Sequence, residues 1–100
     1  MAAVRLVIHL EAKPGKGAEF AKLFNARCEE MRKDKGCLEF QVYQDASNPD
    51  KFALLELWES QADLDAHAAL NAKRPPVPGM AELRADGPGT REDYEYNKTR

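Results

Sequence analysis

The amino-acid sequence predicts an α+β fold in which strands and helices follow the order β-α-β-β-α-β. Four segments place apolar side chains at every second residue, which is typical of strands, and two longer segments place them at helical spacing. Stretches rich in proline, glycine and asparagine separate these segments. The chain has 100 residues, so we expect a single domain with one core over residues 1–100.

The first strand and the first helix are predicted on either side of a proline-glycine turn. In residues 4–12 one face of the predicted strand is wholly apolar and carries Val4, Leu6, Ile8 and Leu10. Pro14 and Gly15 end this strand, because proline cannot donate to the ladder of hydrogen bonds. Residues 18–35 then carry an apolar stripe at helical spacing, made of Phe20, Leu23, Phe24, Cys28 and Met31. Gly36 suits the left-handed residue that follows a helix.

The second and third strands are predicted as a hairpin over residues 37–45 and 51–59, joined by a turn over residues 46–50. The third strand is apolar on both of its faces. One face carries Phe52, Leu54 and Trp58 together with Glu56, and the other carries Ala53, Leu55 and Leu57. Helices on one side of a sheet cover only one such face. We therefore expect a second copy of the chain to cover the other face, in a homodimer that pairs through the sheet.

The second helix is predicted to begin at a capping box, in which the Ser60 hydroxyl and the acidic Asp63 are three residues apart, and to end at about residue 71. Its stripe towards the sheet consists of Leu64, His67, Ala68 and Asn71. A short helical turn over residues 80–85 and a last strand over residues 91–97 follow a proline-rich segment. This order is the ferredoxin-like pattern, a four-stranded antiparallel sheet with both main helices on one face.

Composition excludes several classes of partner. The chain has 15 basic and 17 acidic side chains, a net charge of -2 and no cluster of one sign, so nucleic acid is not an expected partner. No apolar run approaches the roughly 20 residues that cross a bilayer, so we expect a soluble protein without a membrane partner. The first residues lack a secretory signal, and two cysteines make no disulfide framework. These features predict a cytoplasmic protein.

Four residues are candidates for chemistry or contact. The imidazole of His67 can move protons near neutral pH, although a histidine on this stripe can also simply be hydrogen-bonded in the helix-sheet interface. Trp58 is either a core anchor or the wall of a flat pocket. Glu56 is costly among apolar neighbours unless it is paired or protonated, so it is a base or a partner of a backbone amide or an arginine. His9 is predicted on the opposite face, where it would meet the second subunit.

Stronger signatures are missing from the sequence. Cys28 and Cys37 have no flanking ligands at zinc spacing, and no phosphate-binding loop, dinucleotide fingerprint or nucleophile elbow is present. We therefore expect no metal and no cofactor. What remains is an apolar cavity with an aromatic wall, a histidine and a few polar groups, which suits a small molecule.

Four short segments, taken in order, resemble the antibiotic biosynthesis monooxygenase (ABM) domain family. They are Lys13-Pro14-Gly15-Lys16, Lys35-Gly36-Cys37-Leu38, Leu57-Trp58-Glu59-Ser60 and Leu64-Asp65-Ala66-His67. The resemblance is strongest over residues 4–70, and residues 71–100 diverge from it. It implies a ferredoxin-like protomer that pairs into a dimeric α+β barrel, with a pocket between sheet and helices. By position, His67 and Trp58 match the pocket histidine and tryptophan of the family.

The family includes cofactor-independent monooxygenases of quinols or polycyclic phenols and haem-degrading enzymes. The haem-degrading members need an asparagine on the first strand, where this chain has Val7-Ile8-His9, and that difference argues against haem. We therefore expect a small aromatic substrate that reacts with dioxygen. The predicted catalytic residues are His67 as proton acceptor or relay, Trp58 stacked on the ring, and Glu56, with Tyr43 as the alternative for the same role, orienting a substrate oxygen. The predicted substrate-binding residues are Tyr43, Leu64, Asn71 and Phe40.

Two other hypotheses stay open at this stage. One is a non-oxidative isomerase or lyase of the same superfamily that uses His67 as a proton shuttle. The other is a non-catalytic protein that binds a small ligand. Lys73 and Arg74, beyond the second helix, are placed to attract an acidic ligand at the pocket mouth.

Overall fold

A computed structural model describes residues 2–87 and 89–97 and confirms the predicted element order. The elements are β1 (Ala3–Glu11), α1 (Gly17–Met31), β2 (Cys37–Gln44), β3 (Lys51–Trp58), α2 (Gln61–Asn71), α3 (Met80–Leu83) and β4 (Thr90–Tyr96). The strand bounds lie within one residue of the predicted ones. The fold is the ferredoxin-like one that the alternating and helical patterns predict.

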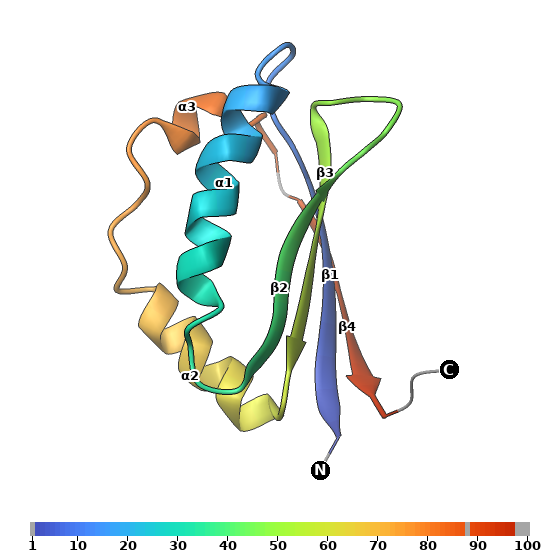
Figure 1. Cartoon of the computed structure of the whole chain (residues 1–100), viewed down its shortest axis with the longest axis vertical. Coiled ribbons are helices and arrows are strands. Elements are labelled where there is room, and N and C mark those ends of the chain that lie inside the picture. The colour runs from blue at the N-terminus through green and yellow to red at the C-terminus, as the bar shows by residue number, and fades with distance from the viewer. Residues whose placement is uncertain (1, 88, 98–100) are drawn as a thin grey trace.

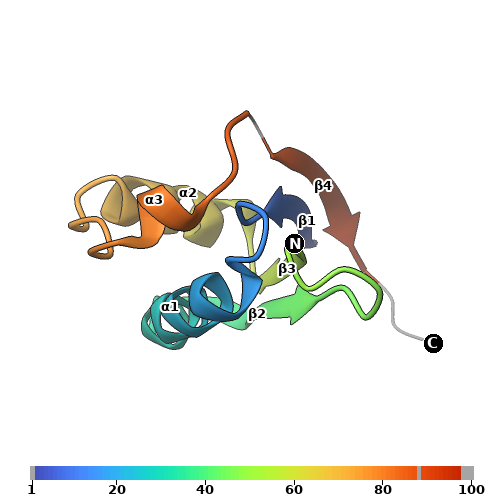
Figure 2. The ribbon, with the colours of Figure 1, turned by 90° about the horizontal axis from the view of Figure 1, so that it is seen from above.

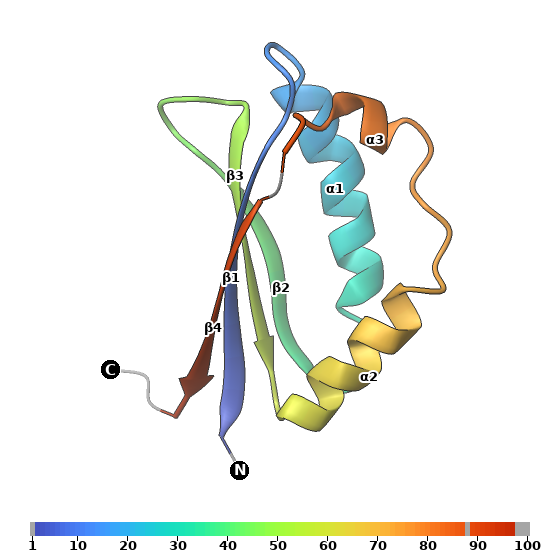
Figure 3. The ribbon, with the colours of Figure 1, turned by 180° about the vertical axis from the view of Figure 1, so that it is seen from behind.

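The four strands form one antiparallel sheet in the order β2-β3-β1-β4 (Figures 1 and 3). The first strand is therefore central, and β3 and β4 both pair with it. Val4, for example, lies opposite Trp58 on β3 and opposite Glu95 on β4. Because side chains alternate across a strand, this register places the apolar residues of β1 and β3 on the same face.

All three helices lie on that face, as the view from above shows (Figure 2). The side chains of Leu6, Phe20, Cys28 and Trp58 are at most 1% exposed and form the centre of the core between the sheet and α1. We call the opposite side of the sheet the outer face. Among the described residues no element covers it, although Ala53, Leu55 and Leu57 there are half-buried by their neighbours and Tyr43 and Tyr94 are exposed.

The first helix ends earlier than the pattern predicts. The prediction extends to residue 35, but α1 ends at Met31, and the N–H of Asp34 donates to the Met31 carbonyl at 3.0 Å in a tight turn. Gly36 adopts φ +79° as expected, and a Cβ at this position would overlap the Asp63 carboxylate of α2. The turn brings Asp34 out of the helix and towards α2, which positions part of the site.

The second helix begins as predicted, because the Ser60 hydroxyl accepts a hydrogen bond from the Asp63 N–H at 3.1 Å. After α2, residues 72–79 run across to α3; we call this segment the strap (Figure 1). Backbone hydrogen bonds from the Lys13 N–H to the Leu83 carbonyl and from the Ala85 N–H to the Glu11 carbonyl fasten the far end of α3 to β1. In the described ranges, no helix has the length and apolar character needed to cross a membrane.

Candidate functional site

A cavity of about 1060 Å³ lies between the helices, the strap and the covered face of the sheet. Its apolar walls include Leu6, Ile8 and Phe24, while the strap residues Pro75, Pro76 and Val77 form one rim. Five of the predicted site residues line it, namely Phe40, Glu56, Leu64, His67 and Asn71. Their convergence follows from the periodicity of β2, β3 and α2, because each lies on the face that these elements turn inward.

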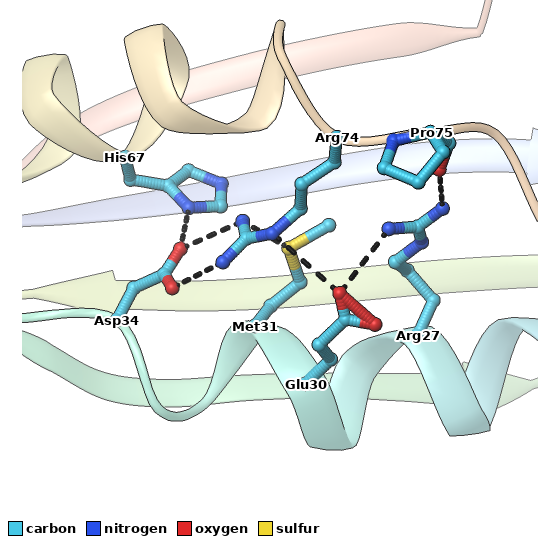
Figure 4. A network of polar contacts seen from close by, with 7 residues as sticks. All are labelled: Arg27, Glu30, Met31, Asp34, His67, Arg74 and Pro75. Carbon is cyan, nitrogen blue, oxygen red and sulfur yellow. Dashed lines mark hydrogen bonds and ion pairs between the residues drawn. The ribbon is translucent and has the colours of Figure 1, made fainter.

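His67 is held by a carboxylate that comes from the end of α1. The side chain of His67 is 8% exposed and that of Asp34 is 7% exposed, and the His67 Nδ1 lies 2.6 Å from the Asp34 Oδ2 (Figure 4). Hydrogen bonding to the Arg74 guanidinium, aided by His67, lowers the pKa of the Asp34 carboxyl below its usual range despite its burial. An ionised Asp34 assigns the proton of a neutral imidazole to Nδ1, which leaves Nε2 as the acceptor.

The strap supplies the other partner of this carboxylate. Arg74 donates from Nη1 to the Asp34 Oδ2 at 2.9 Å and from Nη2 to the Asp34 Oδ1, in a two-pronged contact. The same guanidinium lies 2.9 Å from the Met31 Sδ and 3.6 Å from the Glu30 carboxylate (Figure 4). Arg74 is thus paired with carboxylates of the protein itself, and its predicted attraction of an acidic ligand stays a prediction.

On its sheet side the imidazole stacks on Trp58. The two ring centroids are 4.5 Å apart, with the planes inclined by 31°, and the Phe40 ring meets His67 edge-on at 5.7 Å. The indole is fully buried and donates from Nε1 to the Glu56 Oε1 at 2.9 Å. Burial raises the pKa of the Glu56 carboxyl, and the hydrogen bond from Trp58 opposes that rise.

The structure places two of the predicted site residues outside the lining of this cavity. Trp58 is absent from the described residues that line the cavity, because the imidazole lies across its ring and occupies the position expected for a substrate. Tyr43 pairs with Ala53 on β3, is half exposed and faces the outer side of the sheet, so it does not join the site. Tyr43 and His9 line a separate cleft of about 530 Å³ at the end of the sheet.

Sequence reasoning missed the role of Asp34. The helical pattern placed it inside a helix, and its partners His67 and Arg74 are 33 and 40 residues away in the sequence. No local pattern reports contacts at that separation. The Gly36 that ends the turn was the available signal, because a residue just before a left-handed glycine has left the regular helix.

The arrangement suits proton transfer better than nucleophilic or metal chemistry. Burial raises the pKa of the Cys28 thiol to about 12 and that of Cys37 to about 11, so neither is a ready thiolate. Within residues 2–87 and 89–97, no three His, Cys, Asp or Glu side chains gather as metal ligands would. Among the described residues, the His67 ring makes one hydrogen bond, from Nδ1 to Asp34, so its Nε2 atom is available to a bound molecule.

Residues 3–73 match the family described as antibiotic biosynthesis monooxygenase, which covers the first three strands, both main helices and His67. The chain belongs to this family. Membership supports a monooxygenase-like role in general, and the four segments that predicted it all lie within the matched residues. Arg74 and the rest of the strap lie just beyond them.

Solved structures of other proteins share the fold. A conserved protein from Methanosarcina mazei Go1 is similar over 97% of this chain and 95% of its own, with 31% identity and a TM-score of 0.79. SnoaB, a cofactor-independent oxygenase from Streptomyces nogalater, in a mutant form, covers 99% of this chain and 97% of its own with a TM-score of 0.78. At 12% identity that likeness shows the fold alone.

A curated relative, an uncharacterised protein of Synechocystis, is 32% identical over 59 residues, which are 59% of this chain. The match spans 40% of that relative's length, so the chain corresponds to less than half of it.

Proposed function

We propose that the protein is a cofactor-independent monooxygenase that oxidises a quinol or polycyclic phenol with dioxygen in the cavity beside His67. One observation carries the proposal. An imidazole whose Nδ1 is held by an ionised carboxylate lines a cavity of about 1060 Å³ that has both apolar and charged walls. This reaction needs a base, shelter from bulk water and room for fused rings.

The chemistry begins with proton transfer from the substrate to the His67 Nε2. The resulting anion is electron-rich enough to reduce dioxygen, which adds to a ring carbon as a hydroperoxide. Loss of water then leaves one oxygen atom on that carbon as a carbonyl and releases the other as water. The four electrons that reduce dioxygen come from the substrate carbon and the C–H bonds that are lost, so no external reductant enters the balance.

The two neighbours of His67 have separate parts in this proposal. Asp34 stabilises the imidazolium that forms on proton transfer, as a carboxylate on Nδ1 does in other proton-relay pairs. Glu56 lines the cavity and its pKa is raised by burial, so its protonated form suits donation to a substrate oxygen. Trp58 supports the imidazole from behind and acts as a positioning residue.

We also propose that two copies of the chain pair through the outer face in the cytoplasm. The half-buried Ala53, Leu55 and Leu57 give that face an apolar centre, which supports a protein partner. Sedimentation of the wild type as a dimer and of Leu57→Asp as a monomer is the expected result. A monomeric wild type at micromolar concentration would remove this part of the proposal.

The same histidine-carboxylate pair also favours a second candidate, an isomerase or lyase in which His67 moves a proton without oxidation. Oxygen separates the two candidates, because a monooxygenase stops under anaerobic conditions and an isomerase does not. Thermal stabilisation by an aromatic ligand without any product would instead indicate a binding protein.

The test is oxygen uptake with a hydroxylated anthrone and a menaquinol-like substrate. We expect His67→Gln and His67→Ala to lower the rate by about 100-fold or more, the usual contribution of a positioned general base. The matched control is His9→Ala, which removes the other histidine, exposed on the outer face, and should retain the wild-type rate. Equal rates in the wild type and both His67 variants would remove His67 from the mechanism.

A further inference from the structure

The strap forms one rim of the cavity, and few contacts hold it there. Pro75, Pro76 and Val77 line the cavity directly. Two arginines fasten the strap to α1 and to the turn after it (Figure 4). Arg27 on α1 donates to the Pro75 carbonyl, and Arg74 on the strap donates to Asp34. In the described part of the chain, no other hydrogen bond joins residues 75–79 to α1 or to the sheet.

One carboxylate serves both the strap and the imidazole. The Oδ2 atom of Asp34 accepts from the His67 Nδ1 at 2.6 Å and from the Arg74 Nη1 at 2.9 Å, while its Oδ1 accepts from the Arg74 Nη2. The side chains of Asp34, His67 and Arg74 are 7%, 8% and 15% exposed, so solvent screens this group weakly. A change in either contact must therefore alter the other.

We propose that Arg74 is a positioning residue that couples closure of the strap to the base strength of His67 through the shared Asp34 carboxylate. With the strap closed, the guanidinium neutralises most of the carboxylate charge, and its own positive charge lies beside the imidazole. Both effects make the imidazolium less favourable than it is in the open form, although Asp34 still accepts from the His67 Nδ1 and stabilises it. When the strap lifts, Asp34 is left to His67 alone and the imidazolium is favoured.

This coupling rests on the proposed role of His67 as the base. It also predicts the order in which binding, closure of the strap and proton transfer occur. The open form admits or releases the aromatic molecule while the imidazole tends to keep a proton. Closure, which also excludes water, shifts the imidazole to the form that can accept the substrate proton. The proton that leaves on closure passes to solvent.

Other charged groups near the site lie on the elements around the strap. They are Arg27 and Glu30 on α1, Glu56 on β3, Asp65 on α2, Arg84 and Asp86 after α3, and Arg91 on β4, whose guanidinium is paired with Asp93. Of these, Glu30 also lies 3.6 Å from the strap residue Arg74. Glu56 and Arg91 line the same cavity from the sheet side, and Asp65 accepts from the Gln61 amide. Substitution of Arg74 or of Arg27 removes a cationic partner from Glu30, but only substitution of Arg74 removes one from Asp34, so a difference in the His67 titration between the two variants reports on the Asp34 carboxylate.

The chain offers a matched pair of variants that separates the two tethers. Arg74→Met removes a strap tether and the second partner of Asp34, whereas Arg27→Met removes a strap tether and leaves Asp34 with both partners. Arg74→Lys keeps a positive charge that reaches only one carboxylate oxygen at a time. The readout is the midpoint of the His67 imidazole titration in the ligand-free protein, followed by NMR, which needs no turnover.

We expect the midpoint to rise by about one pH unit in Arg74→Met, by less in Arg74→Lys, and to stay unchanged in Arg27→Met. Association of a phenol under anaerobic conditions should be faster than in the wild type in both methionine variants. An unchanged midpoint in Arg74→Met, or an equal rise in Arg27→Met, would overturn the coupling. Should Arg74→Met not fold, Arg74→Lys against Arg27→Met makes the same comparison. Because the midpoint is measured without substrate, absence of oxygenase activity leaves this test intact.

Discussion

Two buried carboxyl groups flank the imidazole of His67 and differ in almost every respect. Asp34, on the strap side, accepts from His67 and from two nitrogens of Arg74, and these charged partners lower its pKa. Glu56, on the sheet side, accepts from one neutral donor, the Trp58 indole, and burial raises its pKa. The position of each carboxyl group in the fold explains why its partners differ. Asp34 lies in the turn after α1, where Arg74 of the strap can reach it, whereas Glu56 lies within β3, where the strap cannot.

This contrast assigns a different chemistry to each side of the cavity. A carboxyl group with a lowered pKa can stabilise a developing imidazolium, and one with a raised pKa holds its proton more tightly and, when protonated, can donate to an oxygen atom. The imidazole is thus polarised by the first carboxyl group, while the second lines the same cavity and accepts from the Trp58 indole. Three substitutions test whether the two environments are as different as the contacts indicate.

The largest effect is expected on the sheet side, from Trp58→Phe. The smaller ring leaves unfilled volume in the core and removes the N–H that satisfies Glu56, which is 4% exposed. We expect the free energy of unfolding to fall by about 3 kcal/mol, measured by chemical denaturation at pH 7. Phe52→Leu is a control for ring loss without loss of a donor. A Trp58→Phe protein as stable as the wild type would mean that Glu56 finds another donor.

On the strap side, Asp34→Ala should lower the free energy of unfolding by about 2 kcal/mol at pH 7, because it removes charge-assisted hydrogen bonds and leaves Arg74 with the more distant Glu30 as its carboxylate partner. The cost depends on pH with a definite sign. A carboxyl group with a lowered folded-state pKa adds stability above its unfolded pKa, about 3.9, and that stability is lost as the pH falls through the folded value. The difference between the wild type and the variant should therefore shrink as the pH falls below the unfolded pKa. A difference that does not change with pH in this range contradicts the lowered pKa.

The smallest effect is expected from Glu56→Gln, which keeps an oxygen acceptor for the indole. Because the folded pKa is raised, the ionised form of Glu56 weakens the fold above the unfolded pKa of about 4.3. The glutamine variant should be equal to or more stable than the wild type at pH 7, by less than about 1 kcal/mol, and the advantage should shrink towards pH 4. Thermal unfolding at the two pH values measures this. If Glu56→Gln instead unfolds more easily than the wild type at pH 7, the ionised Glu56 carboxylate stabilises the fold, which contradicts the prediction.

The sequence predicts one of these two environments and misses the other. The alternation of β3 places Glu56 with Phe52, Leu54 and Trp58, and helical spacing turns His67 towards the same layer, so the sheet side follows from local patterns. The strap side depends on where α1 ends. A helix continued to residue 35 would point Asp34 elsewhere, and periodicity does not fix helix ends to within a turn.

Local sequence patterns also do not predict which of two inward-pointing side chains lies over the other. The prediction placed Trp58 against the substrate because strand and helix both turn inward, but two inward side chains compete for the same space, and here the imidazole lies over the indole. Tyr43 is different, because its alternation with Phe40 already placed it on the outer face. Its assignment to the pocket came from the chemistry of a phenol and ignored the register.

The most direct test of the central claim is the optical spectrum of a bound phenol in the absence of oxygen, where proton transfer is separated from oxidation. The wild type should convert the bound phenol to its phenolate, with the corresponding red-shifted band, and His67→Gln should bind the phenol and leave it neutral. The same phenolate band in both proteins, or a neutral phenol bound to the wild type, would contradict the assignment of His67 as the base.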